Sequence, residues 1–82
     1  EVDFTGEYNA LIVVQQDKPG VVAHITKILN DRGVNIAFMR LFREEKGHTA
    51  YTIVESDERL PEGVNQLLLE NPNIRDVMVV QQ

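Results

Sequence analysis

Branched apolar residues fill positions 8–16 and then give way to the turn sequence Asp-Lys-Pro-Gly. A short apolar run that stops at turn residues is typical of a buried strand, so we predict a first strand over 8–16. The period then changes to that of a helix, and Gly33 ends it, as glycine often does just past a helix. The apolar face of this helix is made by Val21, Ile25, Ile28 and Leu29.

The rest of the chain predicts a strand pair, a second helix and a last strand. We expect strands over 34–43 and 48–55, joined by the charged turn 44–47. A second helix begins at Pro61, with an apolar face that includes Leu60, and a last strand covers 74–81. The order predicts an α+β fold of ferredoxin-like βαββαβ type, a four-stranded antiparallel sheet with two helices on one face.

The strand predicted over 34–43 carries apolar side chains at both parities. Ile36, Phe38 and Phe42 fall on one side, and residues 37, 39 and 41 are Ala, Met and Leu on the other. One side faces the helices, and the other needs a cover. An exposed apolar sheet face usually marks an interface, which predicts a homodimer through the sheet or contact with another part of a parent chain.

Size and charge narrow the function classes. Eighty-two residues make one domain, and we expect 1–7 to be a lead-in from a parent chain and 8–82 to be the domain. The net charge of −5, with scattered basic residues, argues against nucleic acid as a partner. The apolar runs are far shorter than the roughly 20 residues of a membrane span, so we expect no membrane association.

Cysteine is absent, which excludes disulfides and a thiolate-bound metal or iron–sulfur cluster within this fragment and fits a cytoplasmic location. The two histidines, His24 and His48, lie in different elements, so a metal site is not expected. No nucleophile and base stand out as a pair. We therefore expect no catalytic residue in this chain.

The junction between the first strand and the first helix carries the most chemistry. Pro19 and Gly20 stand where the helix begins, and the N–H groups of Gly20, Val21 and Val22 would be open there. Such a helix start attracts anions, while Asp17 and Asn35 could hold a neighbouring ammonium group. A carboxylate beside an ammonium group is the head of a free amino acid.

Simpler interpretations apply to the same residues. Asp17 could only cap the helix, and Gly20 could serve turn geometry alone. Arg40 and Arg43 are read as solvated charges at a hairpin end. Asn35 points more firmly to a contact, because asparagine is depleted in strands and requires hydrogen-bond partners.

The motifs Asp17-Lys18-Pro19-Gly20-Val21 and Gly33-Val34-Asn35-Ile36, in this order of elements, resemble the ACT domain. The resemblance implies a regulatory module of an amino-acid-metabolising enzyme, which pairs and binds a free amino acid between two copies. Within the family the chain is most similar to the C-terminal ACT domain of bacterial iron–sulfur L-serine dehydratase, β subunit. That resemblance implies L-serine as ligand, no cofactor in this domain, and a 4Fe–4S cluster in the catalytic α chain or domain.

The family's ligand-binding positions are carried over residue by residue. Gln15 stands where some relatives have histidine, which leaves hydrogen bonding without added charge. Two alternatives stay open: a ligand-free dimerisation module, and a small enzyme of acylphosphatase-like fold, which would need an arginine where this chain has Lys18. The implied ligand-binding residues are Gln15, Asp17, Pro19, Gly20, Val21, Val22, Asn35 and Ile36.

Overall fold

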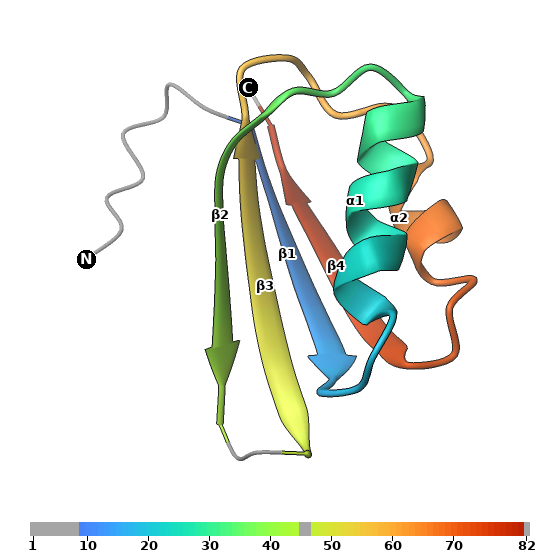
Figure 1. Ribbon diagram of the computed structural model, residues 1–82. Helices are drawn as coiled ribbons and strands as arrows, with labels where there is room; N and C mark the ends of the chain where they lie inside the picture. Colours follow the sequence, from blue (N-terminus) through green and yellow to red (C-terminus); the bar gives the residue numbers. More distant parts are fainter. Residues whose placement is uncertain (1–8, 45–46, 82) are drawn as a thin grey trace.

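The computed structural model describes residues 9–44 and 47–81. The predicted lead-in 1–7, Tyr8 and the turn residues Glu45 and Lys46 lie outside these ranges. In chain order the elements are β1 (Asn9–Gln16), α1 (Val21–Asp31), β2 (Ile36–Arg43), β3 (Thr49–Ser56), α2 (Val64–Leu68) and β4 (Ile74–Val80) (Figure 1).

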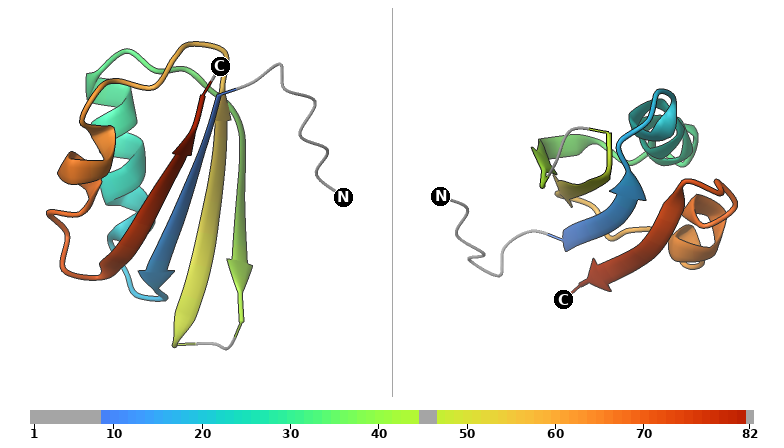
Figure 2. Two further views of the ribbon diagram at one scale, coloured as in Figure 1. Left: turned by 180° about the vertical axis from the view of Figure 1, so that it is seen from behind. Right: turned by 90° about the horizontal axis from the view of Figure 1, so that it is seen from below.

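The four strands form one antiparallel sheet in the order β2-β3-β1-β4. Both helices lie on the same side of this sheet, as the end-on view in Figure 2 shows. The predicted fold class is therefore confirmed. The order places β1 and β3 in the middle and leaves β2 and β4 as the two edges.

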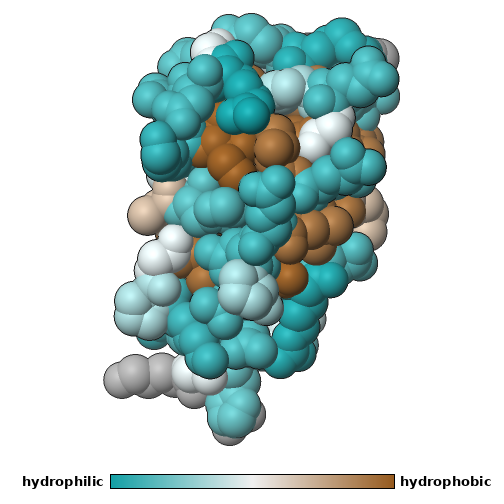
Figure 3. Space-filling view, turned by 90° about the vertical axis from the view of Figure 1, so that its right-hand side faces the viewer, coloured by the Kyte–Doolittle hydropathy of each residue, from teal (hydrophilic) through white to brown (hydrophobic). Residues whose placement is uncertain are grey.

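The core lies between the helices and the two central strands. Strand side chains alternate, so Leu11 and Val13 of β1 point to the helices and are fully buried. Val21, Ile25 and Leu29 of α1 are also fully buried, which confirms the predicted apolar face. Burying each such side chain contributes about 1.5–3 kcal/mol. Figure 3 views the helix side, where polar groups frame apolar atoms that remain visible between them.

The second helix is shorter than predicted, because it does not begin at Pro61. Gly63, with φ 81°, precedes Val64, and the Val64 N–H donates to the Pro61 carbonyl at 3.2 Å in a tight turn. A left-handed residue interrupts a helix, so Leu60 belongs to the loop rather than to a helix face. Leu60 is nevertheless buried, and its N–H donates to Oε1 of Gln81.

Strand β2 contains a bulge, so the predicted assignment of its side chains to the two faces of the sheet is partly wrong. Ile36 lies opposite Ser56 and Phe38 opposite Glu55, so Ala37 has no partner across the pair. An extra residue reverses the alternation at that point. Ile36 therefore points to the helix side and packs against the core, and only Phe38 and Phe42 share the other side. The strand also begins at 36 rather than 34.

Strand β2 is an exposed apolar edge. Phe38, Met39 and Leu41 expose 39%, 41% and 42% of their surface, although Met39 and Leu41 lie on the helix side. No helix of the described ranges is long and apolar enough to cross a membrane. Strands β2 and β4 each leave one edge unpaired in this sheet, and an unpaired edge can accept another strand.

Candidate ligand-binding site

Helix α1 begins without a side-chain cap. Gly20 is the residue before the helix, with φ 90° in the left-handed region that favours glycine, and Val21 is the first helical residue. Pro19 lies in the preceding turn, so the prediction that it occupies the first helical turn is wrong. No side chain accepts a hydrogen bond from the first turn, which leaves the positive end of the helix dipole uncompensated there.

Asp17 does not cap this helix, because its carboxylate reaches the β2–β3 hairpin instead. Its Oδ2 accepts a hydrogen bond from the Gly47 N–H at 3.1 Å and lies 3.1 Å from Nε of Arg43. The Asp17 N–H also donates to the carbonyl of His48 at 2.7 Å. The capping interpretation is therefore wrong, and Arg43 is an ion-pair partner rather than a freely solvated charge.

A hollow of about 430 Å³ lies at this end of α1, between the helix and β2. We call it the Gly20 hollow. Its volume is at the low end of small-molecule pockets, which suits a compact ligand. Its lining residues are Asp17, Lys18, Pro19, Gly20, Val22, Ala23, Leu41, Arg43 and Gly47.

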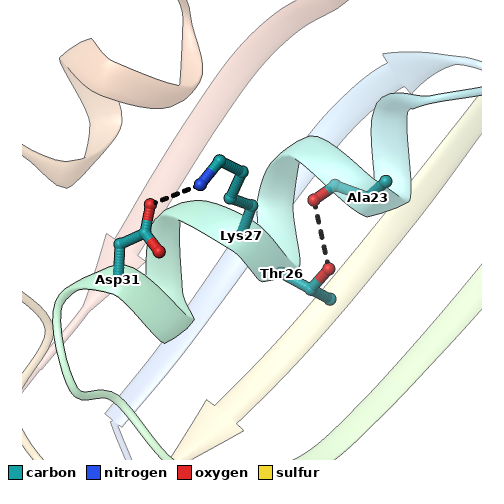
Figure 4. A network of polar contacts seen from close by, with 4 residues as sticks. All are labelled: Ala23, Thr26, Lys27 and Asp31. Carbon is teal, nitrogen blue, oxygen red and sulfur yellow. Dashed lines mark hydrogen bonds and ion pairs between the residues drawn. The ribbon is translucent and has the colours of Figure 1, made fainter.

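A second hollow of about 550 Å³, the Asn35 hollow, lies at the other end of the helix. Its lining residues are Thr26, Lys27, Asn30, Asp31, Val34, Asn35 and Ile36. The helical side chains here bond to their own helix (Figure 4): the Thr26 hydroxyl donates to the Ala23 carbonyl, and Lys27 Nζ lies 2.9 Å from Asp31 Oδ2. The backbone N–H of Asn35 donates to Glu58 Oε1 at 3.0 Å.

Two other predicted site residues lie beneath the surface. Gln15 is 2% exposed, and its Oε1 accepts a hydrogen bond from the Thr52 hydroxyl at 2.7 Å. The side chain of Val21 is fully buried in the core, so only its backbone N–H could meet a ligand. Neither side chain lines the Gly20 hollow.

One copy of the chain does not bring the predicted site together. Asp17, Pro19, Gly20 and Val22 line one hollow, whereas Asn35 and Ile36 line the other. Helix α1, with 11 residues, spans about 16 Å between the two hollows.

Sequence reasoning missed five residues of the Gly20 hollow: Lys18, Ala23, Leu41, Arg43 and Gly47. The last three come from the β2–β3 hairpin, whose end meets the end of β1 because β3 pairs antiparallel with β1. The predicted order of elements contained that signal. Nε2 of His24 is buried and has no hydrogen-bond partner among the described residues. These residues also contain no cluster of three metal-ligating side chains.

Comparisons with known proteins match this chain to a family. The family model for the ACT domain matches residues 9–73. D-3-phosphoglycerate dehydrogenase of Methanocaldococcus jannaschii is 36% identical over 80 residues, which cover 98% of this chain and 15% of that protein. The probable L-serine dehydratase β chain of Bacillus subtilis is 29% identical over 77 residues, 94% of this chain and 35% of that one.

A solved structure has the same fold. The ACT domain of GTP pyrophosphokinase from Chlorobium tepidum superposes with a TM-score of 0.59 and 17% sequence identity, over 89% of this chain and 96% of that one. At this identity the likeness concerns the fold alone.

Proposed function

The chain belongs to the ACT-domain family, and on that premise we propose that it is a regulatory module that binds L-serine between two copies of itself. The observation that carries the proposal is the division of the predicted site between the two ends of α1. A site divided in one copy needs a second copy to complete it.

Strand β2 provides a way to complete the site. In an antiparallel pair, the start of one strand lies beside the end of the other. Pairing of two β2 edges about a two-fold axis would therefore set Ile36 of one copy beside Arg43 of the second. Arg43 lines the Gly20 hollow, and Asn35 immediately precedes Ile36. The other edge strand, β4, also exposes apolar side chains, but of the two edges only β2 contributes residues to both hollows.

The chemistry of the completed site matches the head of an amino acid. The uncapped start of α1 would receive the carboxylate, and Asp17 would receive the ammonium group. The side-chain amide of Asn35 makes no hydrogen bond to another described residue, so it remains available to a ligand of the second copy. Small contacts of this kind recognise the head group and leave little room for a long side chain.

One relative supports L-serine and this parent enzyme, whereas the Methanocaldococcus jannaschii relative of higher identity is a D-3-phosphoglycerate dehydrogenase. L-serine appears in the name of the Bacillus subtilis dehydratase chain, and the present chain spans about a third of that relative. We propose that the parent is an L-serine dehydratase, which converts L-serine to pyruvate and ammonia in another chain or domain. The present chain has no cysteine to ligate a 4Fe–4S cluster, so we assign such a cluster to that catalytic part.

The test is complementation between two defective variants of the 82-residue chain. Asp17→Asn and Asn35→Ala should each weaken L-serine binding about tenfold or more, by loss of a charge-assisted hydrogen bond. A mixed dimer has one site with both changes and one intact site. Mixing the variants should therefore restore binding to a fraction of the dimers, as measured by calorimetry, whereas neither variant alone recovers it.

The wild-type affinity should be modest. Serine has about seven non-hydrogen atoms, and ordering costs lower the attainable free energy, so we expect a Kd between about 10 μM and several mM. D-serine is the matched control, because it has the same groups in the wrong arrangement. Binding of L-serine without complementation would place the site within one copy, and no heat with millimolar L-serine would leave the ligand-free dimerisation module.

A further inference from the structure

We propose that Arg43 lowers the preference of the Gly20 hollow for amino acids by holding Asp17 in place of the ligand's ammonium group. This inference rests on the proposed function, because it concerns the same site. An amino acid that enters the hollow would displace the guanidinium group from the carboxylate. A ligand without an ammonium group would leave the ion pair in place.

The geometry identifies Arg43 as the replaceable partner. Its side chain is 54% exposed at the end of β2, whereas that of Asp17 is 14% exposed. Asp17 is also fixed through its backbone N–H to His48 and through Oδ2 to the Gly47 N–H. Asp17 is therefore anchored by two backbone groups of the hairpin, while the guanidinium has solvent to move into.

The exchange conserves charge and hydrogen bonding at the carboxylate. Arg43 donates from a cationic nitrogen at 3.1 Å, and an ammonium group presents the same charge and donor type. Ion pairs with a solvent-exposed partner contribute little, so their replacement costs little. A hydroxyl in the ammonium position carries no charge and cannot replace the guanidinium on equal terms. Arg43 thus competes only with ligands that carry an ammonium group, and it lowers the preference of the hollow for them.

Arg43 has one chemically reasonable alternative role, and the two roles predict opposite changes in ligand affinity. A guanidinium at the wall of the hollow could instead bind the ligand's carboxylate directly. Removal of a competitor strengthens ligand binding, whereas removal of a carboxylate partner weakens it. The sign of the change in affinity separates the two roles.

The experiment is a calorimetric titration of Arg43→Met with L-serine and with L-glycerate, in which a hydroxyl replaces the ammonium group. Methionine keeps an unbranched side chain as long as the arginine stem to Nε and removes the guanidinium group with its charge. We expect L-serine to bind about two- to fivefold more tightly and L-glycerate to bind no more tightly than to wild type. In an Asp17→Asn background, Arg43→Met should no longer strengthen L-serine binding, because the pair is already broken.

The matched control is Arg75→Met, which makes the same change in net charge at an exposed position of β4, outside both hollows and away from the β2 edge. Arg40 is unsuitable, because it lies on β2, the strand proposed to pair with a second copy, with its guanidinium 4.2 Å from the centroid of the Phe42 ring. Arg75→Met should leave L-serine affinity unchanged. Thermal unfolding of each variant verifies that it is folded, and Arg43→Gln serves as a second, polar replacement.

The outcomes separate this inference from the proposed function. Weaker or unchanged L-serine binding in Arg43→Met, with clear binding to wild type, overturns the role of Arg43 and keeps the site. Binding to Arg43→Met but not to wild type supports the inference, since the competitor then blocks the site. No L-serine binding to either protein overturns both.

Discussion

The hollows at the two ends of helix α1 differ in chemistry more than in volume. The Asn35 hollow is the larger, at about 550 Å³ against about 430 Å³ for the Gly20 hollow. At the Asn35 end, carbonyl groups of the last helical turn are hydrogen-bonded. The Gly33 N–H donates to the Asn30 carbonyl, and the Val34 N–H donates to the Leu29 carbonyl. At the Gly20 end no side chain caps the helix.

This difference teaches that volume alone does not choose the site. In the larger hollow the Thr26 hydroxyl and the charged pair Lys27–Asp31 already bond within their own helix. The smaller hollow combines uncapped backbone donors with the carboxylate of Asp17 and the guanidinium of Arg43. A ligand gains most where backbone donors have no protein acceptor. The Asn35 end then contributes to the ligand through a second copy.

The largest expected effect comes from blocking the β2 edge while both ends of α1 stay intact. Met39→Glu would place two carboxylates close together across the two-fold axis, and like charges at an interface cost several kcal/mol. We expect self-association to weaken by about a hundredfold or more, and L-serine binding to fall with it. Analytical ultracentrifugation and calorimetry on the same samples measure both effects.

Met78→Glu is the matched control for the edge prediction. Met78 is 54% exposed on β4, the other edge strand, against 41% for Met39 on β2. This variant should dimerise and bind L-serine as the wild type does. A dimer that survives Met39→Glu but dissociates with Met78→Glu would transfer the interface to β4 and separate Asn35 from the Gly20 hollow.

Local signals made the fold and the turn predictable. The helical spacing of Val21, Ile25 and Leu29 and the Pro19-Gly20 pair each lie within a few residues, and the structure has α1 and its turn in that place. The order of elements then left few possible topologies. The Gly20 end of the site could therefore be anticipated before any coordinates.

Contacts set by strand register could not be predicted. Arg43 and Asp17 are far apart in sequence and meet only because β3 pairs with both β1 and β2. No turn residue near Ala37 indicates the bulge in the sequence, yet the bulge moves Ile36 to the helix side. The left-handed Gly63 shortened α2 although the apolar spacing alone favoured a longer helix. Each miss reflects tertiary geometry that overrides a local pattern.

An intermediate effect is expected from the two glycines that flank α1. Gly20 has φ 90° and Gly33 has φ 75°, and an added Cβ would meet no atom within 4 Å at either position. The left-handed backbone costs a non-glycine residue about 1–2 kcal/mol, so Gly20→Ala and Gly33→Ala should lose similar stability in denaturant unfolding. Replacing Gly20 thus tests folding as well as binding.

The two glycine variants should differ in their affinity for L-serine. Gly20 lines the Gly20 hollow, so its new methyl group would intrude on the ligand, whereas Gly33 lines neither hollow of α1. We expect only Gly20→Ala to weaken L-serine binding beyond what its lost stability explains. Equal losses of binding in both variants would mean that Gly20 serves turn geometry alone.

The smallest effect concerns Tyr51, on the hairpin beside the Gly20 end. Its pKa is raised above its usual value by partial desolvation, then by the charge of Glu44 and by a hydrogen bond to that carboxylate. The folded state therefore holds the phenolic proton more tightly than the unfolded chain, so this contribution to stability is complete below about pH 10 and falls as the pH rises past it. Tyr51→Phe cannot ionise and should lose less melting temperature between about pH 8 and pH 11 than wild type. Tyr8 is present in both proteins, so its titration cancels in the comparison. Equal losses in circular-dichroism melts of the two proteins would show that Tyr51 titrates alike in the folded and unfolded chains.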